Sequence, residues 1–132
     1  MRLLMCMLML VSIGQSQNPY AAKTVLNGLL WRNTDHNGKI LFVNGMEYGA
    51  ESATDLRLAG TLPACPARVD AKKWFAPDAD EVVKEVDALY LNATNLPLPM
   101  SGAVAYALMK LNGATKQQLD YYRALLLRAF VN

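Results

Sequence analysis

The sequence predicts an all-α fold, a small bundle of four to five helices that follows a cleavable signal peptide. Apolar residues recur at three- and four-residue spacing through most of the chain. Residues that cap helices precede several of these periodic runs, and prolines and glycines separate the runs from one another. Together these observations indicate one helical domain.

The clearest signals for the starts and ends of helices surround residues 80–113, a stretch that is typical of a helix, a proline-bearing connection and a second helix. Asp78, followed three residues later by Glu81, predicts a capping box at the start of the first helix. One face of this helix carries Val82, Val86, Leu89 and Ala93, with Val83 and Tyr90 beside them. We therefore expect this helix to bury that face.

The connection contains Pro97 and Pro99, which push the residues before them out of the helical region. Ser101 is the expected cap of the second helix, and Gly113 is its expected left-handed stop. The apolar face of that helix is Val104, Leu108 and Leu111. Because the connection is short, the two helices should be neighbours that cross at an angle.

The first residues predict a signal peptide over 1–16. A basic start precedes an apolar run from Leu3 to Ile13, and the exit is small and polar, with cleavage after Gly14 or Ser16. The run is shorter than the roughly 20 residues of a membrane span. We therefore expect a periplasmic or secreted protein with one helical domain over 17–132 and no integral membrane span in the mature chain. A buried N-terminal helix is the alternative interpretation.

The composition excludes some classes of function. The formal net charge of +2 gives no electrostatic case for nucleic-acid binding. Cys65 is the only cysteine after the leader, so it has no partner for an internal disulfide, and His36 is the only histidine. No nucleophile–base pair, metal-ligand cluster or phosphate loop occurs, so we expect no enzyme, no metal site and no cofactor.

Two helices are expected in the first half of the mature chain. One runs from Tyr20 to Arg32, and a polar turn follows over Asn33–Gly38. The other runs from Gly38 to Ala53 and is apolar around much of its circumference, which predicts the central helix of the bundle. Gly45 and Gly49 should mark a groove in which another helix packs closely.

The second half of the chain ends on a further helix. Residues 54–77 are the least regular part: LRLAG is compatible with a continued helix, whereas LPACPARVD carries two prolines and indicates a loop. Thr115 with Gln118 predicts a capping box, and the helix continues to about Phe130. The residues expected to face inward are Leu119, Tyr122, Leu126 and Phe130. The residues expected to face outward are Lys116, Asp120, Arg123 and Arg128.

Three carboxylates, Glu47, Glu51 and Asp55, share one face of a helix with Asn44. Like charges four residues apart disfavour a helix slightly. A solvated face is the first interpretation of this stripe. Contact with a basic partner is the second. A calcium site or an acid–base pair for hydrolysis is the third.

An aromatic pair beside two lysines is the other candidate binding surface. Lys72, Lys73, Trp74 and Phe75 follow one another in sequence. Large aromatic side chains are usually well buried, so a plug at the end of the bundle is the first interpretation, and an exposed binding surface is the alternative.

Three short segments carry a resemblance to known proteins. They are KILFVNGMEYG over Lys39–Gly49, Cys65–Pro66, and the pair ALYL over Ala88–Leu91 and AVAYAL over Ala103–Leu108. The chain resembles the Tai-type immunity proteins, which protect cells from peptidoglycan amidases delivered by type VI secretion. It resembles equally well other families of exported helical bacterial proteins whose role is unknown.

The resemblance implies a periplasmic helical domain that binds an amidase and blocks its active-site cleft, often as a homodimer. Such proteins tend to carry disulfides, whereas Leu41 or Phe42 stands here where a partner of Cys65 is expected. If the chain inhibits an enzyme, the loop Leu62–Phe75 is the expected contact.

We therefore expect an exported, non-enzymatic binding protein, immunity-like in its most concrete form, whose partner is another protein. One alternative is a small envelope enzyme or metal-binding protein that uses Glu47, Glu51 and Asp55. The other is a structural envelope protein that self-associates through Trp74 and Phe75.

Overall fold

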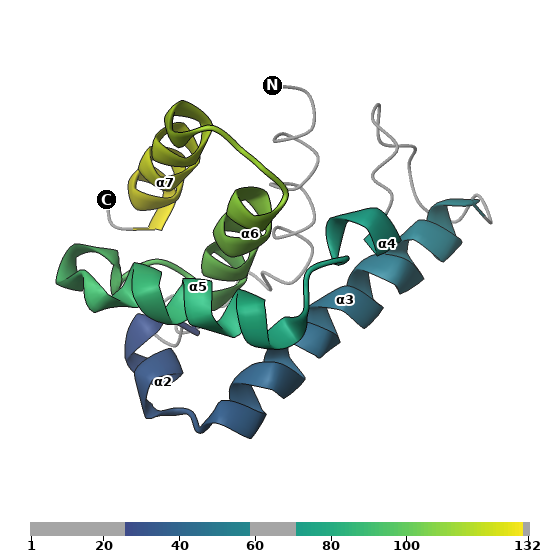
Figure 1. Ribbon diagram of the computed structural model, residues 1–132, viewed down its shortest axis with the longest axis horizontal. Helices are drawn as coiled ribbons and strands as arrows, with labels where there is room; N and C mark the ends of the chain where they lie inside the picture. Colours follow the sequence, from purple (N-terminus) through teal and green to yellow (C-terminus); the bar gives the residue numbers. More distant parts are fainter. Residues whose placement is uncertain (1–25, 59–70, 131–132) are drawn as a thin grey trace.

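The computed structural model of this chain describes residues 26–58 and 71–130. The expected signal peptide, Cys65 and most of the loop Leu62–Phe75 lie outside these residues. The elements, in chain order, are α2 (Gly28–Asn33), α3 (His36–Leu58), α4 (Ala71–Trp74), α5 (Ala79–Leu91), the 3-10 turn η2 (Ala93–Asn95), α6 (Met100–Leu111) and α7 (Lys116–Phe130). The prediction of an all-α fold is confirmed, with about four main helices packed together (Figure 1).

The core is built around α6. Its buried residues are Met100, Gly102, Ala103, Val104, Ala105, Ala107, Leu108 and Met109. Figure 1 shows α6 crossing α5 steeply, with α7 on the far side of α6 from α3. A Cβ on Gly102 would lie only 2.9 Å from the methyl carbons of Leu126, so α7 packs closely against α6 because this position is a glycine.

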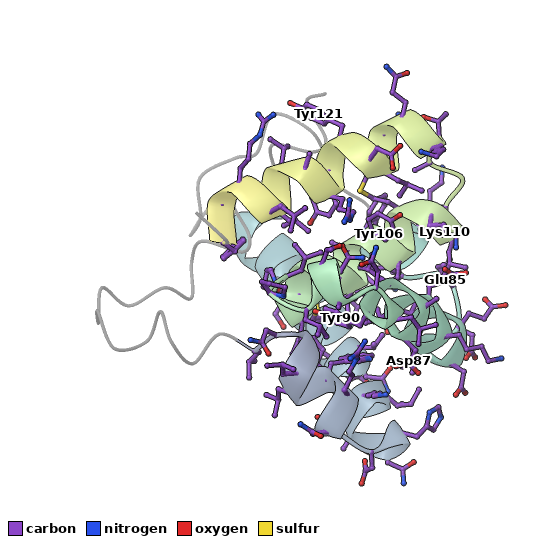
Figure 2. The ribbon with its side chains drawn as sticks, turned by 90° about the vertical axis from the view of Figure 1, so that its left-hand side faces the viewer. Glu85, Asp87, Tyr90, Tyr106, Lys110 and Tyr121 are labelled. Atoms are coloured by element: carbon purple, nitrogen blue, oxygen red, sulfur yellow. The ribbon has the colours of Figure 1, made fainter. Side chains whose placement is uncertain are left out.

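The contact between α5 and α6 is the most extensive in the fold. The apolar face expected for α5 is confirmed at Val82, Val86 and Leu89, which are buried, but Ala93 is exposed and lies in η2. At the surface end of this contact, Nζ of Lys110 lies 2.5 Å from Oε2 of Glu85 (Figure 2). Burial and one peripheral ion pair thus fix α6 against α5.

The prediction that α3 is the central helix is wrong. Among its described side chains, only that of Val43 is a fully buried hydrophobic one, while Leu41 and Tyr48 are exposed. Figure 1 shows α3 along the edge of the molecule, with α4 and α5 against one side of it. The small residues of α6 let three helices approach one another, and α6 therefore takes the central place.

Two helix boundaries also differ from expectation. Asn27 has an extended backbone, and its side chain accepts hydrogen bonds from the N–H groups of Leu29 and Leu30, so α2 begins at Gly28 and no helix runs through Asn27. The chain turns before His36, and Oδ1 of Asp35 accepts the N–H of Gly38 at 2.7 Å. The expected polar turn is therefore partly helical.

The start of α6 is fixed by a distant segment. Ser101 was the expected cap, but the helix begins at Met100 and has no side-chain cap. The N–H of Met100 instead donates to the carbonyl of Leu26 at 2.6 Å, and the N–H of Gly28 donates to that of Leu96 at 3.0 Å. The segment before α2 thus takes over the capping of α6.

The other local signals are confirmed, although Asp78 acts as a simple N-cap of α5 and not in a capping box with Glu81. The carboxylate of Asp78 accepts the N–H of Asp80 at 2.8 Å at the start of α5. The N–H of Thr115 donates to Oε1 of Gln118 at 2.8 Å before α7. Gly113 has a φ of +85°, which places it in the left-handed region.

Arg123 was expected to face outward, but it is half-buried and joins α7 to η2. Its Nε donates to Oδ1 of Asn95 at 2.6 Å. Asn95 is buried and in turn donates to the carbonyl of Leu89 at 2.8 Å. This chain of hydrogen bonds satisfies a buried amide, which would be costly to leave unpaired.

A polar node, made of the side chains of Trp31, Lys39 and Asp87, joins α2, α3 and α5. The Trp31 side chain is fully buried, and its Nε1 donates to Oδ1 of Asp87 at 2.7 Å. Nζ of Lys39 donates to the same oxygen at 2.8 Å and lies 5.4 Å from the centre of the Trp31 ring. One carboxylate of α5, that of Asp87 (labelled in Figure 2), therefore holds one side chain from each of the other two helices.

Replacing Asp87 by alanine should lower the free energy of unfolding by about 2 kcal/mol, because two donors lose a charged acceptor. Urea denaturation followed by Trp fluorescence measures this loss. The control is Asp120→Ala, which removes only a surface pair with Lys116 within α7 and should leave stability nearly unchanged. Equal losses in both variants would contradict the importance of the node.

Candidate functional site

The water-exposed side of α3 carries no charge between Leu41 and Ser52. The exposed residues in this part of the helix are Leu41, Gly45, Tyr48, Gly49 and Ser52, which we call the α3 face. Their spacing places them on one side of the helix. The side chains of Leu41 and Tyr48 are the largest of the group, and these residues are 71% and 69% exposed.

The polarity of α3 departs in part from that of an ordinary surface helix. Such a helix turns its apolar residues toward the core and its charged residues toward water. Here Glu47 and Glu51 are half-buried, while Leu41 and Tyr48 face water. Neighbours within the described part of the chain therefore do not account for the composition of the α3 face.

The two glycines of the α3 face are open to approach. A Cβ built on Gly45 or Gly49 meets no heavy atom within 4 Å. At Gly28, by contrast, a Cβ would lie 2.4 Å from the ring of Tyr90. The groove expected at Gly45 and Gly49 is thus not filled by another helix of the described residues, although each glycine costs about 1 kcal/mol in a helix interior.

The α3 face stands on a rigid support. Lys39, two residues before the face begins, is held by Asp87, and the ring of Phe42 packs edge-on against Trp31 with 6.2 Å between centroids. Val43 is buried on the opposite side of α3. These contacts fix the rotation of α3 about its axis and so determine which residues face water.

The expected carboxylate stripe is not the most exposed side of α3. Glu47 and Glu51 are half-buried, and the side chain of Asp55 lies outside the described residues. Within 26–58 and 71–130, no group of three or more His, Cys, Asp or Glu side chains is arranged to hold a metal ion. The interpretation as a cation site or acid–base pair stays a prediction.

The expected aromatic pair lies where α4 meets the end of α6. Phe75 is buried in the core, and the half-buried Trp74 packs against it. The carbonyl of Trp74 accepts a hydrogen bond from Nδ2 of Asn112 at 2.9 Å. This placement matches a plug at the end of the bundle, while Lys72 and Lys73 stay exposed.

Two tyrosines have raised pKa values for structural reasons. Burial raises the pKa of Tyr122 to about 12. Burial also raises the pKa of Tyr90, whose hydroxyl donates to the carbonyl of Leu98 at 2.9 Å. Both side chains are protonated at neutral pH, so both pack as neutral groups and Tyr90 also acts as a hydrogen-bond donor.

Sequence reasoning missed the α3 face because it treated every apolar residue of this helix as inward-facing. The available signal was the uncharged series Leu41, Gly45, Tyr48 and Ser52 at helical spacing. His36, the lone histidine, lies at the start of α3 with Nε2 2.8 Å from Oδ1 of Asp80, and this exposed contact is peripheral to the face.

No protein-family model matches this chain, and the comparisons with curated proteins and with solved structures also give no match. In the part of the chain that the structure describes, no helix combines the length and the apolar character that crossing a membrane requires.

Alanine at Gly45 should raise the free energy of unfolding by up to about 1 kcal/mol, because alanine favours a helix and the site has space. Alanine at Gly28 should lower it by about 1–3 kcal/mol, because the new methyl group collides with Tyr90. Chemical denaturation of dilute protein measures both changes. A loss at Gly45 as large as that at Gly28 would mean that the α3 face is packed within the monomer.

Proposed function

We propose that this chain is an exported, non-enzymatic binding domain of the cell envelope that attaches to another protein through the α3 face. The observation that carries the proposal is the exposure of Leu41 and Tyr48 beside open glycine backbone on an uncharged side of a helix. Covering apolar surface yields roughly 25 cal/mol per Å². The cores of protein interfaces are depleted in charge and enriched in tyrosine, as this face is.

The form of the face suits a rigid docking surface. Gly45 and Gly49 leave the helix backbone accessible, so an apolar ridge of a partner can approach closely between Leu41 and Tyr48. The contacts of Lys39 and Phe42 described above hold α3 in place. A preorganised surface loses little conformational freedom on binding.

The most concrete form of this function is inhibition of a peptidoglycan amidase, as the resemblance to immunity proteins implies. In that form the α3 face contacts the rim of the amidase cleft, and the body of the domain prevents the substrate from entering. The loop Leu62–Phe75 was the expected contact. The chain enters that region from the end of α3 and leaves it through α4, which packs against α3.

The test is capture from periplasmic extract with the tagged chain, read by mass spectrometry. We expect the wild type to recover a peptidoglycan amidase and to inhibit the purified amidase in a peptidoglycan-clearing assay. Tyr48→Lys should reduce recovery and inhibition at least tenfold, because a charge would be buried at the centre of the contact.

The matched control is Leu91→Lys, which changes an 80% exposed leucine at the end of α5. It should bind as the wild type does. Equal recovery by the wild type and Tyr48→Lys, or recovery of nothing, would contradict the proposed function. Recovery of a different protein that is lost with Tyr48→Lys would support binding and refute the inhibitor form.

A further inference from the structure

We propose that, in the absence of another protein, the α3 face is covered by the α3 face of a second copy of this chain, in a weak antiparallel pair. This inference rests on the proposed function, because it concerns the same surface. It adds regulation, since any other partner must displace the second copy. The inference depends on the order of residues within the face.

The α3 face contains a protruding side chain, that of Leu41, and a gap at Gly49, and both lie at the same distance along the helix from Gly45. Leu41 lies four residues before Gly45, and Gly49 lies four residues after it. A two-fold axis at Gly45 therefore places Leu41 of each copy against Gly49 of the other. Two identical surfaces fit only if they are self-complementary in this way.

The glycines make the close approach possible. Within the described part of the chain, neither Gly45 nor Gly49 has a heavy atom within 4 Å of its Cβ position, so the backbone itself forms the floor of the contact. At the axis the two Gly45 residues face each other without side chains between them. Each Leu41, now 71% exposed, would pack against the second helix.

The absence of charge removes the usual obstacle to pairing identical surfaces. A charged residue near a two-fold axis meets its own copy and is repelled. From Leu41 to Ser52 the exposed positions carry no charge, and the carboxylates of Glu47 and Glu51 belong to half-buried residues beside the face. Two copies can therefore meet along the face without opposing like charges.

The size of the face sets the strength of the pair. Leu41, Tyr48 and the neighbouring backbone offer on the order of 400 Å² per copy, against about 800 Å² per partner in a standard stable interface. We therefore expect a dissociation constant between about 10 µM and 1 mM. A pair of this strength covers the apolar face at high local concentration and yields to a partner with more contact area.

Sedimentation equilibrium of the purified chain between about 10 µM and 1 mM tests the inference. The wild type and Leu91→Lys should shift from monomer toward dimer across this range. Gly49→Leu should weaken the pair at least tenfold, because it fills the hole that receives Leu41. Its monomer should unfold at the same or a higher urea concentration, since the site is open and leucine favours a helix.

Exchanging the two positions tests the register. In Leu41→Gly combined with Gly49→Leu, each new leucine again faces a glycine of the other copy, so pairing should recover at least tenfold relative to Gly49→Leu alone. A wild type that stays monomeric at 1 mM, or a Gly49→Leu variant that pairs as the wild type does, would overturn the proposal. Failure of the exchanged variant to recover pairing would overturn the antiparallel register.

Because these sedimentation measurements use the chain alone, their outcome is independent of the capture of another protein.

Discussion

The orientation of α3 depends on one carboxylate oxygen. Oδ1 of Asp87 accepts hydrogen bonds from the indole of Trp31 and from the ammonium of Lys39, so α5 holds α2 and α3 at the same point. The fully buried Trp31 ring gives this node an apolar support, against which Lys39 and Phe42 pack. Rotation of α3 about its axis would remove Lys39 from Asp87. The exposed position of Leu41 and Tyr48 is therefore a consequence of core packing.

Local signals in the sequence predicted the ends of several helices correctly, and distant contacts explain the errors. Asp78, Gly113 and Thr115 act within a few residues of themselves, so their roles can be recognised from sequence alone. The start of α6 depends instead on Leu26, more than seventy residues earlier in the chain. Local patterns contain no information about such a partner, which is why Ser101 was the wrong expected cap.

The candidate surface was predictable only in part. The sequence predicted that Gly45 and Gly49 mark a groove in which another helix packs closely, but no helix of the described residues fills that groove. Periodicity indicates that a helix is rich in apolar residues and does not give the number of its neighbours. The small residues of α6, including Gly102, let α5 and α7 pack around that helix and leave α3 at the edge.

Covalent labelling by hydroxyl radicals, inside the cells that produce the chain and in dilute purified protein, tests most directly whether the α3 face is a covered binding surface. Tyr48 and Tyr121 are both well exposed in the monomer, at 69% and 52%, and they lie on α3 and α7. We expect labelling of Tyr48 to fall several-fold in the cells while that of Tyr121 stays unchanged. Equal labelling of Tyr48 in both settings would mean that nothing covers the face, and it would contradict this account.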